Sequence, residues 1–388
     1  MKKKTGVYLD GAANTPLDKR VLKVMKPFLK EDFIGNSHAI HDFGINALVA
    51  IEDARNKIAS ALKLKPGEVY FTSGATESNN WVIKSVAINS LINNTRKHIV
   101  CSAIEHASVL KACQEVEKWG IEVTYVKPNA KGKILARSIK KALRPDTALI
   151  CVMAVNNETG CVCEADQAAA YAKKQKTLSL IDITQLVGYG GKYMEIGKTF
   201  PHGDFFSFSA HKIYGPTGVG CLIARKDITL DPFIIGGAQE GGKRGGTSNT
   251  AGIVGLGEAV RLLHDNTSAD LYFEGLYNYL KKGIIKLGGK LNAIPDHKNI
   301  VSICMADVLH EESLAASLAL CGIAVSAGSA CDAEHDDIFG PLNPSHVLDA
   351  MGLSEDEIRN TVRVSFTLYN TTKDIDELLK ALEELIHE

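Results

Sequence analysis

Residues 204–220 read "DFFSFSAHKIYGPTGVG", an apolar run that ends in Ser-Ala-His-Lys before a glycine-rich loop. The run is short and rich in phenylalanine, which is typical of a buried strand. A lysine at the end of such a strand is costly as a charged bystander. Lys212 would be useful there as an amine that condenses with an aldehyde. The simpler alternative is a lysine that emerges into solvent where the loop begins.

This run is one of seven that alternate with helical patterns, which predicts a mostly parallel sheet covered by helices on both faces. After about residue 265 the pattern changes to helix, strand and helix, which indicates a smaller α+β unit. We therefore expect an α/β protein with a large domain at 16–260 and a small domain formed by 1–15 and 261–388. The expected strands of the large domain lie in "EVYFTS", "KHIVCSAI", "EVTYVKP", "TALICVMAV", "LSLIDI", "FFSFSA" and "GCLIAR".

Composition narrows the class of protein. The chain has 388 residues and a net charge of −1, so no overall basic field points to nucleic acid. No apolar run approaches the roughly 18 residues of a membrane span, and no secretory signal is evident. The nine cysteines are an odd number spread through a large chain, which favours reduced thiols in the cytoplasm. "CVC" at 161–163 has no second pair at zinc spacing, so we expect no metal.

Polar residues follow several of the expected strands. "FTSGATESNN" (71–80) joins a strand to a helix through small residues, an arrangement that suits an anion. Asp182, Gln185, His106 and "AVNNETG" (154–160) also stand at strand ends. Each has an ordinary explanation as a turn or a helix cap. Ligands of open α/β sheets bind outside the carboxyl ends of the strands, so together these residues predict one site.

"SAGSACDAEHDDIFG" (326–340) contains the cysteine that is hardest to interpret. From these fifteen residues alone, Cys331 could be a buried filler, a metal ligand or a nucleophile on a mobile loop. The strand-end cluster argues against the filler, because we expect this loop to reach the site that the cluster predicts. We expect the acidic residues after Cys331 to be mobile in the absence of a partner.

Nine motifs occur in order along nearly the whole chain and together resemble one family. They are "YLDGAANTP", "FTSGATESNN", "EHASVL", "VNNETG", "IDITQ", "SAHKIYGPTGVG", "GGKRGGTSN", "SAGSAC" and "VRVSF". The chain resembles the cysteine desulfurases, which are pyridoxal-phosphate enzymes of the class V aminotransferase type. The resemblance implies the aspartate aminotransferase-like fold of pyridoxal-phosphate-dependent transferases, with a seven-stranded sheet in the large domain and the catalytic cysteine loop in the small one.

The resemblance also implies roles for single residues. Lys212 matches the lysine that binds pyridoxal phosphate, and Cys331 matches the nucleophile. His106 matches an imidazole that stacks on the cofactor ring and shuttles protons. Arg363 matches the arginine that holds the substrate carboxylate, with Asn36 and Asn157 nearby. The remaining cofactor positions are Ala75, Thr76, Ser209 and His211 at the phosphate, Thr247 reaching it from a neighbouring subunit, Asp182 at the pyridine nitrogen, and Gln185 and Asn157 at the ring hydroxyl.

The implied reaction removes sulfur from L-cysteine, giving L-alanine and a persulfide on Cys331. A homodimer would pass this sulfur to an acceptor protein for iron–sulfur cluster assembly or tRNA thiolation. Alternatives are a selenocysteine lyase, another β-elimination or transamination enzyme on this fold, or a non-catalytic protein that retains it. Two glycines depart from the family pattern "GGGQERGxRSGT": Gly241 replaces an arginine and Gly245 a serine. The segment after Cys331 is also longer than usual. Because the given sequence ends soon after its last helical pattern, we do not expect the tail with which family members often dock a scaffold protein.

Overall fold

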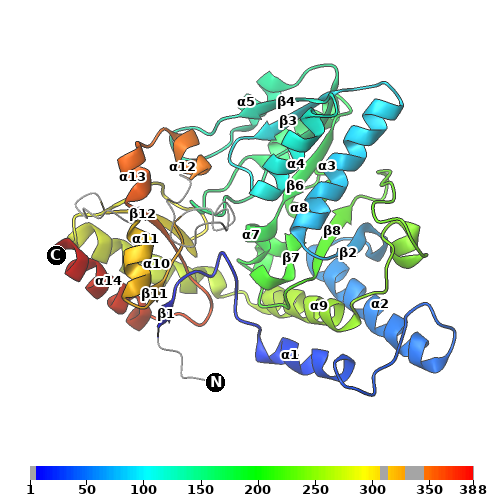
Figure 1. The fold of residues 1–388 in the computed structure, drawn as a ribbon, viewed down its shortest axis with the longest axis horizontal. Helices are drawn as coiled ribbons and strands as arrows, with labels where there is room; N and C mark the ends of the chain where they lie inside the picture. The colour runs from blue at the N-terminus through cyan, green and yellow to red at the C-terminus, as the bar shows by residue number, and fades with distance from the viewer. Residues whose placement is uncertain (1–5, 306–312, 328–344, 388) are drawn as a thin grey trace.

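A computed structural model describes residues 6–305, 313–327 and 345–387 of the chain (Figure 1). Its largest element is the predicted sheet of seven strands, in the order β2-β8-β7-β6-β5-β3-β4. Neighbouring strands from β4 to β7 are parallel, whereas β8 runs antiparallel to both β7 and β2. The strands are β2 Val69–Thr72, β3 His98–Ser102, β4 Glu122–Val126, β5 Thr147–Cys151, β6 Leu178–Asp182, β7 Phe205–Ser209 and β8 Gly220–Ala224.

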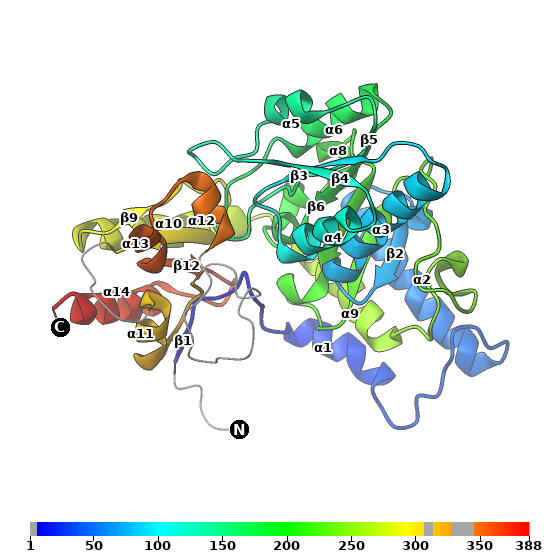
Figure 2. The ribbon, with the colours of Figure 1, turned by 45° about the horizontal axis from the view of Figure 1, so that its top comes forward.

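Helices cover both faces of this sheet, as the alternating pattern predicts (Figure 2). Successive residues of a strand point to opposite faces, so Ile99 and Cys101 join one buried cluster with α3 and α4, while Val100 joins another. Helices α2, α5, α6 and α9 supply the second cluster. These helices are α2 Asp42–Leu62, α3 Ala75–Ile92, α4 Ala107–Glu117, α5 Ala136–Ala142, α6 Ala165–Lys174 and α9 Thr250–Asp265, and shorter ones are α1 Lys19–Met25, α7 Thr184–Val187 and α8 Ile196–Thr199.

A second unit has its own hydrophobic core. Strand β10 lies between β9 and β12 and is antiparallel to both, while β1 near the start of the chain pairs in parallel with β11. The N-terminal strand therefore lies beside the C-terminal helix in space (Figure 1). The elements are β1 Val7–Tyr8, β9 Lys290–Leu291, β10 Ile300–Cys304, β11 Ile323–Ala324, β12 Thr361–Ser365, α10 Ala269–Lys286, α11 Leu314–Leu320, α12 His346–Met351, α13 Glu355–Arg359 and α14 Thr372–His387.

Helix α12 departs from this division of the chain. Although it follows β11 in sequence, its fully buried Val347 packs in the core of the large sheet. The chain thus crosses between the two hydrophobic cores more than once. The domain boundaries expected at residues 16 and 260 remain a prediction.

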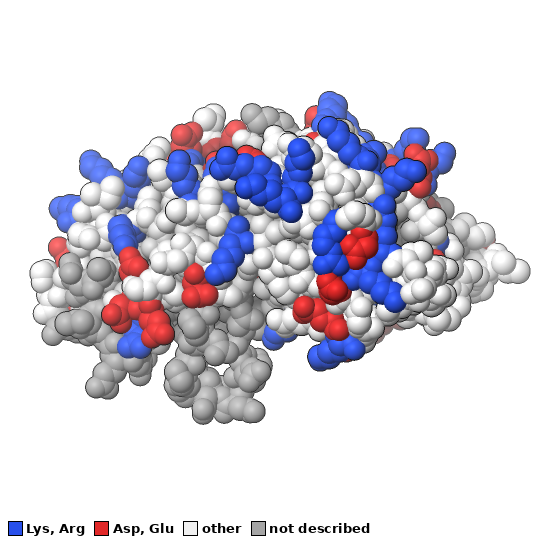
Figure 3. All heavy atoms as spheres, turned by 90° about the horizontal axis from the view of Figure 1, so that it is seen from above, with Lys and Arg blue, Asp and Glu red and all other residues white. Residues whose placement is uncertain are grey.

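Charge is distributed unevenly over the surface. The face seen from above carries more Lys and Arg than Asp and Glu (Figure 3), although the whole chain has a net charge of −1. In the part of the chain that the structure describes, every helix is too short or too polar to cross a bilayer.

Candidate active site

The site lies at one edge of the large sheet, because β3, β5, β6 and β7 are parallel and end there together. Strand β2 ends at the same edge, since it is antiparallel to β8, which is antiparallel to β7. The residues that directly follow these strands are the ones that the sequence singled out. Parallel pairing is therefore what gathers them.

The first turn of α3 leaves backbone amides without intrahelical partners. Gly74 caps the helix without a side-chain hydrogen bond, and the Ala75 amide donates to Ser209 Oγ at 2.8 Å. Among the described residues, the amides of Thr76 and Glu77 donate no hydrogen bond. Free amides at the positive end of a helix dipole are suited to a phosphate group. 

A close approach of backbones keeps this first turn of α3 beside β8. A Cβ atom added to Gly220 would lie 2.5 Å from the Gly74 Cα and 2.8 Å from the Phe208 carbonyl oxygen. Only glycine therefore fits where β8 begins, which places the start of α3 against the end of β7.

Lys212 turns into the molecule instead of emerging into solvent. It ends a short 3-10 helix, Ala210–Lys212, and its Nζ donates to the carbonyls of Ala12 and Ala13, both at 2.7 Å. Gln185 Nε2 donates to the same Ala12 carbonyl at 3.2 Å. The N-terminal segment thus gathers the predicted lysine and the predicted amide around one pair of carbonyls.

Asp182 ends β6 and is 5 % exposed. Its Oδ1 accepts the amide of Thr184, the first residue of α7, at 2.9 Å, whereas the N-cap of α7 is Ile183, which makes no side-chain capping bond. Its Oδ2 accepts a hydrogen bond from Asn79 Nδ2 at 3.0 Å. The carboxylate is therefore held in one orientation by two donors. Sequence reasoning missed Asn79, whose only signal is a polar residue beside the apolar "WVI" of a buried helix.

Two histidines lie at this edge of the sheet. His106 caps α4, and its Nδ1 accepts the Ser108 amide at 3.1 Å. His211 precedes Lys212, and burial lowers its pKa to about 4, with smaller effects from the charges of Lys212 and His106. A neutral His211 at pH 7 adds no further positive charge beside the amine.

Arg363 lies in β12 of the second unit and is 3 % exposed. Its Nη2 donates to Asp10 Oδ1 at 2.8 Å and its Nη1 to the Asn157 carbonyl at 3.0 Å. Its Nε is buried and has no hydrogen-bond partner among the described residues. Arg363 therefore meets Asn157, at the edge of the large sheet, across the junction of the two units. Asp10 lies in "YLDGAANTP", and its partnership with Arg363 could not be read from the sequence.

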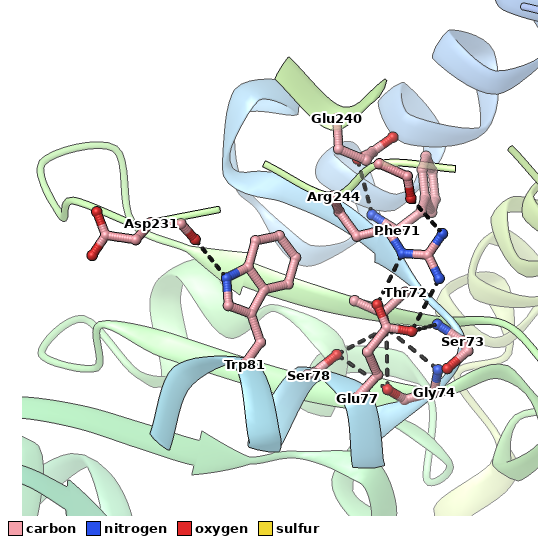
Figure 4. Close-up of polar contacts among 11 residues, drawn as sticks. Phe71, Thr72, Ser73, Gly74, Glu77, Ser78, Trp81, Asp231, Glu240 and Arg244 are labelled. Atoms are coloured by element: carbon pink, nitrogen blue, oxygen red, sulfur yellow. Dashed lines mark hydrogen bonds and ion pairs between the residues drawn. The ribbon is translucent and has the colours of Figure 1, made fainter. Parts of the chain in front are cut away.

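The loop that carries Thr247 is fastened to α3 (Figure 4). Arg244 donates from Nε and Nη2 to the two carboxylate oxygens of Glu77, at 2.9 and 3.1 Å, and Glu77 also accepts the Ser73 amide at 2.8 Å. This arrangement lowers the pKa of Glu77, since the hydrogen bonds outweigh the opposing effect of burial. Thr247 and Ser73 line a pocket of about 200 Å³ in the same chain.

The two family departures in this loop have different surroundings. A Cβ at Gly245 would lie 2.8 Å from the Gly236 Cα, so the serine of the family pattern would collide with backbone. Gly241 has open space around it but a φ of +65°, a conformation that L side chains rarely adopt. Glycine at both positions follows from the path of this loop.

Two predicted residues stand apart from the cluster. Asn36 lies in the exposed loop before α2, where its Oδ1 accepts the His38 amide. None of the described contacts joins it to Arg363 or Asn157. Cys331 and the acidic segment after it lie outside the described residues.

Both ends of the described chain around Cys331 adjoin the site. Ser326 exchanges two backbone hydrogen bonds with Arg363, at 2.7 and 3.2 Å. Ser345 Oγ donates to Glu158 Oε2 at 2.5 Å, and Glu158 directly follows Asn157.

Comparison with known proteins gives consistent results. The family described as "Aminotransferase class-V" matches residues 7–378. A curated protein named cysteine desulfurase IscS, from Dictyoglomus turgidum, is 40% identical over 393 residues, covering 99% of this chain and 95% of that protein. The cysteine desulfurase IscS of Methanosarcina thermophila is 36% identical, with 98% and 92% covered.

Solved structures extend the likeness to the fold. One described as a NifS-like protein superposes with a TM-score of 0.89 at 33% identity, covering 99% of this chain and 100% of that one. Another, described as SspA in complex with cysteine, has a TM-score of 0.78 at 36% identity, with 94% and 100% covered.

Proposed function

The chain belongs to the class-V aminotransferase family, and we propose that it is a pyridoxal-phosphate-dependent cysteine desulfurase. The reaction removes sulfur from L-cysteine, releases L-alanine and leaves a persulfide on Cys331. The observation that carries this proposal is the meeting of an inward-turned lysine, a buried carboxylate and a helix N-terminus at one sheet edge.

The residues at this edge fit pyridoxal phosphate. The amides of the first turn of α3 suit its phosphate, Asp182 suits a pyridinium N–H, and Lys212 suits its aldehyde. When bound, the cofactor supplies a ring that withdraws electrons from the substrate α-carbon. The other proposed contacts are Ala75, Thr76, Ser209 and His211 at the phosphate, Thr247 of a neighbouring subunit, His106 over the ring, and Asn157 and Gln185 at the ring hydroxyl.

We assign the remaining steps of the reaction to side chains of this protein. Arg363 binds the substrate carboxylate, for which a guanidinium is well shaped, while Asp10 keeps it oriented. Lys212 takes up the proton of the α-carbon, and His106 moves protons near the ring. The Cys331 thiolate attacks the substrate sulfur, so a sulfur–sulfur bond forms as the carbon–sulfur bond breaks. Asn36 is proposed to assist at the carboxylate.

Incubation with L-cysteine and a reductant tests the proposal through release of sulfide and alanine. Wild-type protein should be yellow and active, Lys212→Ala should lose the yellow absorbance of the lysine-bound cofactor, and Cys331→Ser should keep the cofactor without releasing sulfide. Full activity of Cys331→Ser would place the nucleophile elsewhere. Selenocysteine, assayed beside cysteine, distinguishes a selenocysteine lyase.

The homodimer is supported by exposed apolar side chains along the α1–α2 region. Ile40 is 97% exposed, and Ile34 and Val49 are 68% and 62% exposed. Apolar groups gathered in this way favour contact with another protein surface. A second copy of the chain would cover these side chains, and in such a dimer the Thr247 of each subunit would reach the phosphate site of the other. Sedimentation of Ile40→Asp, compared with wild type at equal concentration, should show dissociation into monomers.

The final acceptor of the sulfur is proposed to be another protein, for iron–sulfur cluster assembly or tRNA thiolation. We propose that the reaction takes place in the cytoplasm, because the eight cysteines in the described residues are all free thiols.

A further inference from the structure

Asn79 connects two predicted catalytic groups through a chain of buried hydrogen bonds. Its Nδ2 donates to Asp182 Oδ2 and to Ser108 Oγ, both at 3.0 Å. Its Oδ1 accepts the Ser207 hydroxyl at 2.5 Å. Ser108 Oγ lies 2.9 Å from Nδ1 of His106. Asn79 and Ser207 are fully buried, so these hydrogen bonds are shielded from bulk solvent.

Counting donors settles the direction of each bond. Asp182 accepts the Thr184 amide on its other oxygen, and an ionised carboxylate can only accept, so the Asn79 NH₂ group must face it. The second hydrogen of that NH₂ group then points at Ser108 Oγ, which accepts it. The single Ser108 hydroxyl proton is left to point at His106 Nδ1.

The same direction follows from the histidine end. Nδ1 of His106 also accepts the backbone amide of Ser108 at 3.1 Å, so this nitrogen carries no proton. Neutral His106 must therefore hold its proton on Nε2. The donor counts from Asp182 and from His106 agree at Ser108, where one hydroxyl accepts from Asn79 and donates to the imidazole.

We propose that Asn79 and Ser108 are positioning residues that hold His106 in the Nε2–H tautomer and tie that tautomer to the Asp182 carboxylate. The inference rests on the proposed function for the roles of His106 and Asp182 at the cofactor. It adds that the group at the pyridine nitrogen and the group over the ring are not set independently. One side chain of α3, the helix that cradles the phosphate, orients both.

Nitrogen NMR of holoenzyme labelled with ¹⁵N-histidine tests the relay, with the His106 signals assigned by their loss in His106→Gln. Wild-type His106 should show an unprotonated Nδ1 and a protonated Nε2. Ser108→Ala removes one of the two donors to Nδ1 among the described residues, so the ratio of the tautomers should shift by roughly three- to tenfold, the worth of one hydrogen bond. Ser108→Thr keeps the hydroxyl and should restore the wild-type ratio.

Asn79→Ala should shift the ratio in the same direction, because the Ser108 hydroxyl loses the donor that orients it. In the Ser108→Ala background, Asn79→Ala should cause no further shift, since the link is already broken. Asn80→Ala is the matched control: the neighbouring amide donates only to the Thr76 carbonyl in the described structure, and its loss should leave the ratio unchanged.

A proton on Nδ1 in the wild-type enzyme would overturn the proposal, as would equal effects of Asn79→Ala with and without the Ser108 hydroxyl. Should Asn79→Ala fail to fold, Ser108→Ala and Ser108→Thr decide the matter alone. The NMR experiment reads the tautomer without turnover, so it tests this proposal separately from the proposed function. The tautomer prediction can be wrong while sulfide is still released, and it can be right in a protein that releases no sulfide.

Discussion

Glu240→Ala should destabilise the protein far more than Glu52→Ala does. Both substitutions remove an acidic partner of Arg55, but the Glu240 side chain is buried and the Glu52 side chain is exposed. The Glu240 carboxylate accepts Nη1 and Nη2 of Arg55 at 2.9 and 2.8 Å and also the Phe71 amide at 3.0 Å. The Glu240 and Arg55 side chains are 6% and 12% exposed, against 48% for Glu52. The two substitutions thus compare a buried and an exposed pair on one guanidinium.

The expected magnitudes follow from burial. Removing one member of a buried ion pair leaves an uncompensated charge, which costs about 3–5 kcal/mol. The value for Glu240→Ala should lie near the lower end, because Arg55 keeps a hydrogen bond to the Val69 carbonyl at 2.6 Å and its place over the Phe71 ring. An exposed pair is worth only about 0.2–1 kcal/mol, so Glu52→Ala should be nearly silent.

Urea unfolding followed by Trp81 fluorescence measures this difference, in a Trp119→Phe background with pyridoxal phosphate saturating throughout. Trp81 reports on the segment that leads to Glu240, because its ring stacks on the Phe233 ring with centroids 6.1 Å apart and its Nε1 donates to the Asp231 carbonyl at 2.8 Å. Equal losses of stability in the Glu240→Ala and Glu52→Ala proteins would refute the argument from burial.

Further predictions concern a crowded glycine and a buried acid. Gly245→Ser should lower the free energy of unfolding in urea by about 1–3 kcal/mol, because its Cβ would lie 2.8 Å from the Gly236 Cα. Gly241→Asn should lower it less, because that position has open space and asparagine tolerates a left-handed backbone. An equal loss of stability in the two variants would exclude crowding as the cause. Burial raises the pKa of Glu105 to about 8, so the folded state retains a proton that the unfolded chain releases from about pH 4.5 upward. The stability contributed by that proton is lost as pH rises through this window, so Glu105→Gln should gain in thermal midpoint relative to wild type between pH 5 and pH 8; a constant difference across that range would contradict the raised pKa.

The sequence predicted the elements better than it predicted their partners. Strand and helix periods are written in the spacing of apolar residues over a few positions, so all seven strands of the large sheet could be located in advance. The strand-end rule then indicated that Asp182, His106 and Lys212 share one edge. Neither argument reaches Asn79, because its importance comes from Asp182, Ser108 and Ser207, which lie elsewhere in the chain.

Helix α12 shows the same limit at the level of packing. Its place in the sequence assigns it to the small domain, yet Val347 is buried in the core of the large sheet. An amphipathic pattern says that a face will be buried but not which core will bury it.

By itself, the sequence determined the α/β class, the order of the strands along the chain and the chemical groups available for catalysis, because these depend on residue type and local spacing. Tertiary structure decided which of those groups meet. It turned Lys212 toward the carbonyls of Ala12 and Ala13, joined Arg363 to Asp10 across 353 positions, and placed one amide between Asp182 and Ser108. Such contacts arise from the packing of distant segments, for which no local pattern exists to be read.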